Sequence, residues 1–150
     1  MIKEKFNLKN KVAIVTGASK GIGEAIARGL AEFGANVVVS SRKQEAVEKV
    51  ASEFNSEGLS SIAIECHVAK EDQQQNLIKK VFNKYGRIDI LVNNAGTNPY
   101  FGPFDKMPID IYKKTMDINL NSAISLSNLV YPIMKNCLLY TSDAADELCR

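Results

Sequence analysis

The sequence lacks several features that would place it in a specialised class of protein. It has no tryptophan, one histidine and three cysteines among its 150 residues. The cysteines, Cys66, Cys137 and Cys149, are odd in number and have no metal-ligand spacing. Neither a disulfide framework nor a metal site is therefore expected.

No charge of one sign dominates, and no apolar run is long enough to span a bilayer. Nineteen Lys and Arg stand against 17 Asp and Glu, for a formal net charge of +2, and the basic residues are scattered. This balance gives no reason to expect nucleic acid or a membrane as a partner. The polar N-terminus, residues 1–11, is not a secretory signal. A cytoplasmic protein is expected, and a peroxisomal signal would lie at a C-terminus beyond this chain.

Strand-like and helix-like patterns alternate along the chain. Short β-branched runs at 11–16, 37–39, 61–66 and 90–92 predict four buried strands. Apolar residues at helical spacing lie between them: Ile22, Ile26, Leu30, Phe33; Val47, Val50, Ala51, Phe54; Leu77, Ile78, Val81, Phe82, Tyr85. This alternation predicts an α/β fold, a doubly wound parallel sheet of the Rossmann type.

The rest of the recognisable pattern is a loop and a long helix. Residues 96–108 are rich in Gly, Pro, Asn and Asp, which is typical of a loop. A single helix is expected from about Asp110 to Lys135. Its apolar positions are Met116, Leu120, Ala123, Ile124 and Ile133.

A glycine-rich turn between the first strand and the first helix is the strongest local signal. It reads Thr16-Gly17-Ala18-Ser19-Lys20-Gly21-Ile22-Gly23. Glycines let the backbone approach a pyrophosphate, and the helix N-terminus offers it free N–H groups. The alternative is an ordinary glycine turn. The predicted phosphate-binding residues are Gly17, Ser19, Lys20, Gly21, Ile22 and Gly23.

The TGxxxGxG spacing resembles the signature of the short-chain dehydrogenase/reductase family. Two further motifs resemble that family, Asn93-Asn94-Ala95-Gly96 after the fourth strand and Asp117-Ile118-Asn119-Leu120 on the long helix. The resemblance implies that Asn94, Ala95 and Gly96 lie at the cofactor. It also implies that Asn119 is the asparagine of the catalytic tetrad, where it helps to hold a water.

The end of the second strand indicates which nicotinamide cofactor is used. NAD-binding folds place an acid there to bond the ribose 2′-hydroxyl, whereas this chain has Ser41 and Arg42. A guanidinium can grip a 2′-phosphate with two hydrogen bonds, and Lys20 can add a second positive charge. The expected cofactor is NADP(H), with Arg42 as main selector. The alternative is that Arg42 and Lys43 are a solvated loop pair.

His67 departs from the family, which usually has an acidic or amide residue there. The resemblance implies that His67 and Val68 lie beside the adenine, far from the hydride. His67 is therefore not expected to act as a catalytic base.

The family's catalytic serine, tyrosine and lysine are expected beyond this chain. A formal Tyr-x-x-x-Lys match, Tyr131 to Lys135, is rejected because it lies twelve residues after Asn119 on the same expected helix.

Residues 137–150 resemble the translation of a transposon-based sequencing-library adapter, and a lineage-specific helix ending is the alternative. We expect residues 1–136 to be the N-terminal part of one NADP-binding domain, truncated after about four strands and the long helix. Residues 137–150 are expected to be a non-native read-through tail.

The implied function is an oxidoreductase that moves a hydride between NADP(H) and a carbonyl or alcohol substrate. Three segments, Val37 to Gln44, Cys66 to Val68 and Asn98 to Gly102, resemble the carbonyl-reductase branch with tropinone-reductase-like members. The family implies a homodimer or homotetramer with the long helix at an interface. The 150 residues by themselves are expected to be inactive. The rival hypothesis is a nucleotide-binding protein without catalysis, since a fold does not fix a function.

Overall fold

The computed structural model describes residues 6–136 and contains one parallel sheet. The strands are β1 (Val12–Thr16), β2 (Asn36–Ser41), β3 (Ser61–Glu65) and β4 (Ile90–Val92). Their order across the sheet is β3-β2-β1-β4. β1 pairs with β2 from Val12↔Asn36 and with β4 from Ala13↔Ile90, both in parallel. The doubly wound α/β fold expected from the sequence is confirmed.

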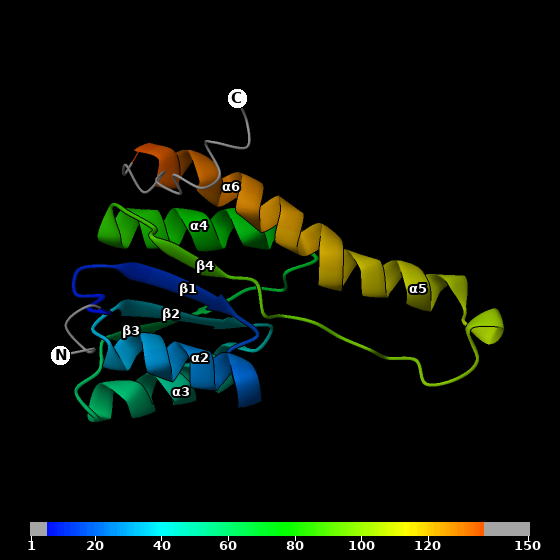
Figure 1. The fold of residues 1–150 in the computed structure, drawn as a ribbon, viewed down its shortest axis with the longest axis horizontal. Coiled ribbons are helices and arrows are strands. Elements are labelled where there is room, and N and C mark those ends of the chain that lie inside the picture. The colour runs from blue at the N-terminus through cyan, green and yellow to red at the C-terminus, as the bar shows by residue number, and fades with distance from the viewer. Residues whose placement is uncertain (1–5, 137–150) are drawn as a thin grey trace.

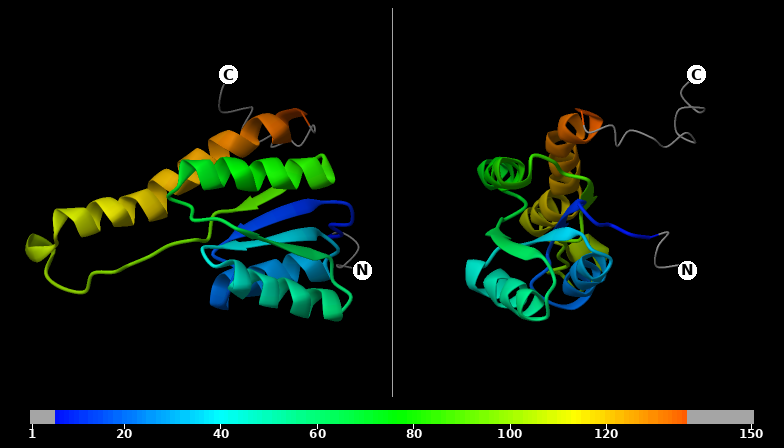
Figure 2. Two further views of the ribbon diagram at one scale, coloured as in Figure 1. Left: turned by 180° about the vertical axis from the view of Figure 1, so that it is seen from behind. Right: turned by 90° about the vertical axis from the view of Figure 1, so that its left-hand side faces the viewer.

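Helices cover both faces of this sheet, as Figures 1 and 2 show. Helices α2 (Gly21–Glu32) and α3 (Gln44–Ser56) lie on one face, and α4 (Glu71–Tyr85) and α6 (Ser122–Asn136) lie on the other. Side chains alternate along a strand, so Val12 and Ile14 enter one core and Ala13 and Val15 the other. A strand covered on both faces reads as a continuous apolar run, which explains the pattern of β1.

The buried face of α2 differs from the expected one. Its buried residues are Gly23, Ala27 and Ala31, while Ile22 is 75% exposed and Phe33 is 38% exposed. Phe82 on α4 is also exposed, at 44%. The prediction was wrong at these positions because it weighted large side chains, whereas α2 approaches the sheet closely through glycine and alanine.

The single long helix expected from about Asp110 is interrupted. It consists of α5 (Ile109–Met116), a π-helical turn (Asp117–Asn121) and α6. α5 has no buried residue and extends beyond the sheet (Figure 1). The expected apolar face is wrong in part, because Leu120 is 46% and Ile124 52% exposed, and the buried residues are Ile118, Ser122, Leu126 and Val130.

The preceding loop contains a short 3-10 turn at Phe104–Lys106. Among residues 6–136, none of the helices is both long and apolar enough to cross a bilayer. The expected read-through tail, residues 137–150, lies outside the described residues.

Candidate functional site

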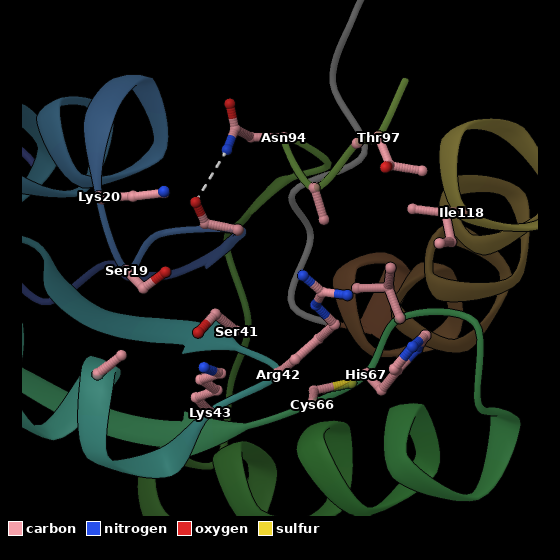
Figure 3. Close-up of a pocket in the computed structure, with 15 residues that line it drawn as sticks. Ser19, Lys20, Ser41, Arg42, Lys43, Cys66, His67, Asn94, Thr97 and Ile118 are labelled. Atoms are coloured by element: carbon pink, nitrogen blue, oxygen red, sulfur yellow. Dashed lines mark hydrogen bonds between the residues drawn. The ribbon is translucent and has the colours of Figure 1, made fainter. Parts of the chain in front are cut away.

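A cavity of about 520 Å³ lies at the carboxyl ends of all four strands. The chain leaves β3 through α4 and crosses to the far side of β1, so the winding direction changes between β1 and β4. Open α/β sheets bind ligands at such a switch point, and the volume is in the usual range for small-molecule sites. The lining residues are Gly17, Ser19, Lys20, Ser41, Arg42, Lys43, Ala46, Cys66, His67, Val68, Asn94, Ala95, Gly96, Thr97 and Ile118 (Figure 3).

Two glycines of the glycine-rich turn leave no room for a side chain. A Cβ on Gly17 would lie 2.9 Å from the Ala95 Cα, and its φ of +66° favours glycine in any case. A Cβ on Gly23 would overlap both the carbonyl oxygen of Gly17 and the side-chain nitrogen of Asn94. The glycines therefore let α2, the turn after β1 and the segment after β4 meet at one point.

Thr16, at the last position of β1, joins the turn to the segment after β4. Its Oγ1 donates to the Val92 carbonyl oxygen at 3.1 Å and accepts from the N–H groups of Asn94 and Ala95, each at 3.1 Å. The Asn94 side chain donates in return to the carbonyl oxygens of Thr16 (3.0 Å) and Gly17 (3.3 Å). This network fixes the two motifs against each other. The sequence analysis included Thr16 in the glycine-rich motif but assigned no role to its side chain.

The cavity is lined by positive charge. Lys20, Arg42 and Lys43 line it, and none of its fifteen lining residues is Asp or Glu. In Figure 3, Arg42 lies between Lys20 on the α2 side and His67 on the opposite side. Such a site favours a phosphate-bearing ligand, because it presents positive charge and has no carboxylate that would repel the phosphate.

His67 forms three hydrogen bonds, two through its backbone and one through its ring. Its N–H donates to Gln73 Oε1 at 2.7 Å, its carbonyl accepts from Lys70 N at 2.8 Å, and its Nδ1 accepts from Ala69 N at 3.3 Å. Burial, followed by the positive charges of Arg42 and Lys70, lowers the pKa of His67. Because Nδ1 is an acceptor, the ring proton is assigned to Nε2.

The neighbouring Cys66 has a thiol of low reactivity. Burial, and secondarily the charge of Asp72, raises the pKa of its thiol to about 11. A thiol with that pKa stays protonated at neutral pH and is a poor nucleophile. Cys66 therefore contributes a wall to the cavity and no reactive group.

Asn119 lies in the π-helical turn and holds the opposite wall. Its Oδ1 accepts from Thr97 N at 2.7 Å, and its Nδ2 donates to the Thr97 carbonyl at 2.8 Å. Thr97 and Ile118 line the cavity, whereas Asn119 acts on it through Thr97. Single π turns inside α-helices often mark functional positions, and this one aims the Asn119 amide at the loop after β4.

Comparison with known proteins places this geometry in a family. The family described as short chain dehydrogenase matches residues 11–138. The chain belongs to the short-chain dehydrogenase family. Dehydrogenase/reductase SDR family member 4 from Oryctolagus cuniculus is 44% identical over 128 residues, which cover 85% of this chain and 49% of that protein. Dehydrogenase/reductase SDR family member 2, mitochondrial, from Homo sapiens is 42% identical over 135 residues, 90% of this chain and 48% of that protein.

Two solved structures share the short-chain dehydrogenase fold seen here. A hydroxysteroid dehydrogenase from Escherichia coli superposes with a TM-score of 0.84 at 36% identity, over 89% of this chain and 56% of that one. A metagenomic short-chain oxidoreductase in complex with NADP gives 0.81 at 35% identity, over 85% of this chain and 58% of that one. The chain thus spans about half the length of the curated relatives that it matches.

Most of the predicted cofactor residues of this chain come together in the cavity. Those that line it are Gly17, Ser19, Lys20, Ser41, Arg42, His67, Val68, Asn94, Ala95 and Gly96. Gly21, Ile22 and Gly23 form the first turn of α2 and do not line it. Their contact with a phosphate, through the N–H groups of a helix start, stays a prediction. The residues that line the cavity but were not predicted as cofactor-binding are Lys43, Ala46, Cys66, Thr97 and Ile118.

The formal Tyr-x-x-x-Lys match is not part of this site. Tyr131 and Lys135 lie on α6 and neither lines the cavity. Twelve helical residues separate Tyr131 from Asn119, which corresponds to about 18 Å along the axis. Tyr131 is also 51% exposed. Both residues of the match therefore lie outside this cavity, and its rejection as a catalytic pair stays a prediction.

Proposed function

We propose that this chain is the NADP(H)-binding part of an oxidoreductase that acts on a carbonyl or alcohol substrate. One observation carries the proposal: a cavity at the switch point of the sheet is lined by Lys20, Arg42 and Lys43 and by no carboxylate. An NAD site would place an acid at the end of β2, where Ser41 stands. The 2′-phosphate of NADP(H) adds negative charge at that place, and these residues fit it.

The residues present fit the cofactor along its length. The glycine turn with Ser19 would receive the pyrophosphate, because Gly17 and Ser19 line the cavity just before the N-terminus of α2. Ser41 and Arg42 would hold the 2′-phosphate, with His67 and Val68 beside the adenosine. Asn94, Ala95 and Gly96 would continue the site toward the nicotinamide. When bound, the cofactor supplies the hydride chemistry, and the protein supplies its orientation.

The relatives support an oxidoreductase over a protein that only binds nucleotide. The names of those relatives describe dehydrogenases and reductases, and one solved relative is a complex with NADP. Within the family we favour the carbonyl-reductase branch, on the segments Val37 to Gln44 and Asn98 to Gly102. The site residues, cofactor and substrate class of the whole protein are part of this proposal.

The chemistry of the whole protein needs groups that this site does not bring together. We propose that residues 1–136 form the N-terminal part of the domain and that the 150-residue polypeptide alone is inactive. Asn119 is then the one residue of the catalytic tetrad in the described site. We further propose a homodimer or homotetramer, supported by the exposed apolar residues Ile109, Tyr112 and Ile124 along α5 and α6.

A charge reversal at Arg42 tests the cofactor assignment. In the full-length gene product, Arg42→Asp should weaken NADPH relative to NADH by roughly 100-fold, because two charge-assisted hydrogen bonds are replaced by repulsion. Fluorescence titration with both cofactors measures the ratio.

Lys49→Asp is the matched control for this experiment. It makes the same change of charge on the exposed side of α3, outside the cavity. Its NADPH/NADH ratio should equal that of the wild type. An unchanged ratio in Arg42→Asp would refute the assignment of Arg42 as the selector.

A further inference from the structure

Gln74, in the second turn of α4, is a buried amide with both ends bonded. It is 2% exposed, although it shares a helix face with the apolar residues Leu77, Ile78 and Val81. Its Nε2 donates to the Val68 carbonyl oxygen, and its Oε1 accepts from Ser125 Oγ at 2.6 Å. Burying an amide in an apolar core is costly unless every end is paired, so packing alone does not favour glutamine here.

The first end of this amide fixes one wall of the cavity. Val68 and His67 form that wall, and the adjacent Gln73 accepts from the His67 N–H at 2.7 Å. Two successive glutamines of α4 therefore hold two successive residues of the wall. Neither Gln73 nor Gln74 lines the cavity, so both act on it through the backbone.

The second end of the amide connects that wall to α6, the helix that follows Asn119. Ser125 lies on α6, which runs beside α4 in Figures 1 and 2. The π-helical turn that leads directly into α6 carries Asn119, whose amide holds Thr97 at 2.7 and 2.8 Å. The segment from Asn119 to Ser125 thus links the wall after β3, through Gln74, to the wall after β4, through Asn119.

We propose that Gln74 is a positioning residue for the cofactor: its amide holds the His67–Val68 wall in register with α6 and so sets the affinity for the adenosine end. This inference rests on the proposed NADP(H) function. It assigns a role in binding to a residue that does not touch the ligand. The contribution should be separable from catalysis, because the Gln74 amide bonds Val68 and Ser125, whereas the Asn119 amide bonds Thr97.

The test replaces Gln74 by methionine, which keeps the length of the side chain and removes both hydrogen bonds. In the full-length gene product, Gln74→Met should weaken binding of adenosine 2′,5′-bisphosphate by roughly 5- to 10-fold. The KM for NADPH should rise in parallel, while kcat stays within about twofold of the wild type because only binding is altered.

Gln75→Met is the matched control, since Gln75 is the next residue and is exposed. It should leave both the affinity and the KM unchanged. Equal affinities in Gln74→Met and Gln75→Met would overturn the inference, as would a fall in kcat with an unchanged KM.

Ser125→Ala keeps the question answerable if Gln74→Met fails to fold. It removes the α6 end of the link and leaves the bond from Gln74 to Val68. Binding of adenosine 2′,5′-bisphosphate should weaken by about 2- to 3-fold, and an unchanged affinity would overturn the inference. If the wild type itself binds neither the bisphosphate nor NADPH, the proposed function fails, which is a different result from a wild type that binds and variants that match it.

Discussion

The core of the sheet and the edge formed by β4 and α5 are buried to different degrees. Under α2 and α3, the core residues Val37, Val39, Val47 and Phe54 are fully buried. At the β4 edge, by contrast, all three residues of the strand are half-buried, and α5, which extends beyond the sheet, has no buried residue. The core of the sheet is thus packed within residues 6–136, whereas the helical arm, formed by α5, the π-helical turn and the start of α6, exposes apolar side chains.

The largest effect on stability is expected in the core of the sheet. Phe54 on α3 is fully buried, and truncation would leave a cavity beneath the sheet. Phe54→Ala should lower the free energy of unfolding by about 3–5 kcal/mol. Denaturant unfolding of the full-length gene product measures this.

The matching substitution on the helical arm sharpens the comparison. Ile124 on α6 is 52% exposed, so Ile124→Ala should cost less than about 0.5 kcal/mol in a monomeric state. A loss as large as that of Phe54→Ala would show that another surface, of a partner or of the rest of the gene product, covers the arm in solution.

The next-largest effect is expected at the cavity, where α2 meets the segment after β4. Gly23→Ala would push a Cβ into the Gly17 carbonyl and the Asn94 side chain. The expected cost is about 3 kcal/mol, together with weaker NADPH binding, because backbone cannot move away as a flexible side chain would. Gly29→Ala on the same helix is the control.

A methyl group on Gly29 would meet no atom within 4 Å beyond the neighbouring backbone of its own helix. Alanine there should therefore be neutral or stabilising by about 0.5–1 kcal/mol. Thermal unfolding of both variants and a titration with NADPH distinguish the two sites. Similar effects at Gly23 and Gly29 would contradict the close contact between α2 and the segment after β4.

A smaller effect than that of Gly23→Ala is expected at the other end of the sheet, where Asp89 joins β1 to β4. Asp89 accepts from Val12 N and Arg87 Nε, each at 2.8 Å, and pairs with Lys11 at 3.4 Å. Burial raises the pKa of Asp89, but the hydrogen bonds from Arg87 and Val12 and the two positive charges outweigh it, so the pKa lies below its ordinary value. The native state therefore favours the carboxylate.

Asp89→Asn should cost about 1–2 kcal/mol at pH 7, reduced by the partial exposure of Arg87 and Lys11. A lowered pKa stabilises the fold above the unfolded-state pKa of about 4, and the gain is lost as pH falls through the folded-state pKa. The difference between wild type and variant should thus shrink below about pH 4. A difference independent of pH would exclude the charge of Asp89 as its cause.

Much of the fold and of the site could be predicted from the sequence because both depend on local patterns. β-branched runs place strands, and Gly17 to Gly23 mark the turn at which a strand becomes a helix. Tertiary contacts were harder to predict. The small residues that α2 packs against the sheet, Gly23, Ala27 and Ala31, were missed because a close helix–sheet approach does not appear as hydrophobic periodicity. The π-helical turn at Asn119 was missed because its spacing differs little from that of an α-helix.

The sequence by itself determined the succession of strands and helices along the chain, the glycine turn and the residues at each strand end. These features follow from short-range conformational preferences. Only the tertiary structure decided that Thr16 joins the turn to the segment after β4, that Asn119 acts through Thr97, and that Gln74 links Val68 to Ser125. These contacts join residues far apart in the chain. A hydrogen bond depends on distances of about 3 Å and on direction, which arise only when the elements have packed.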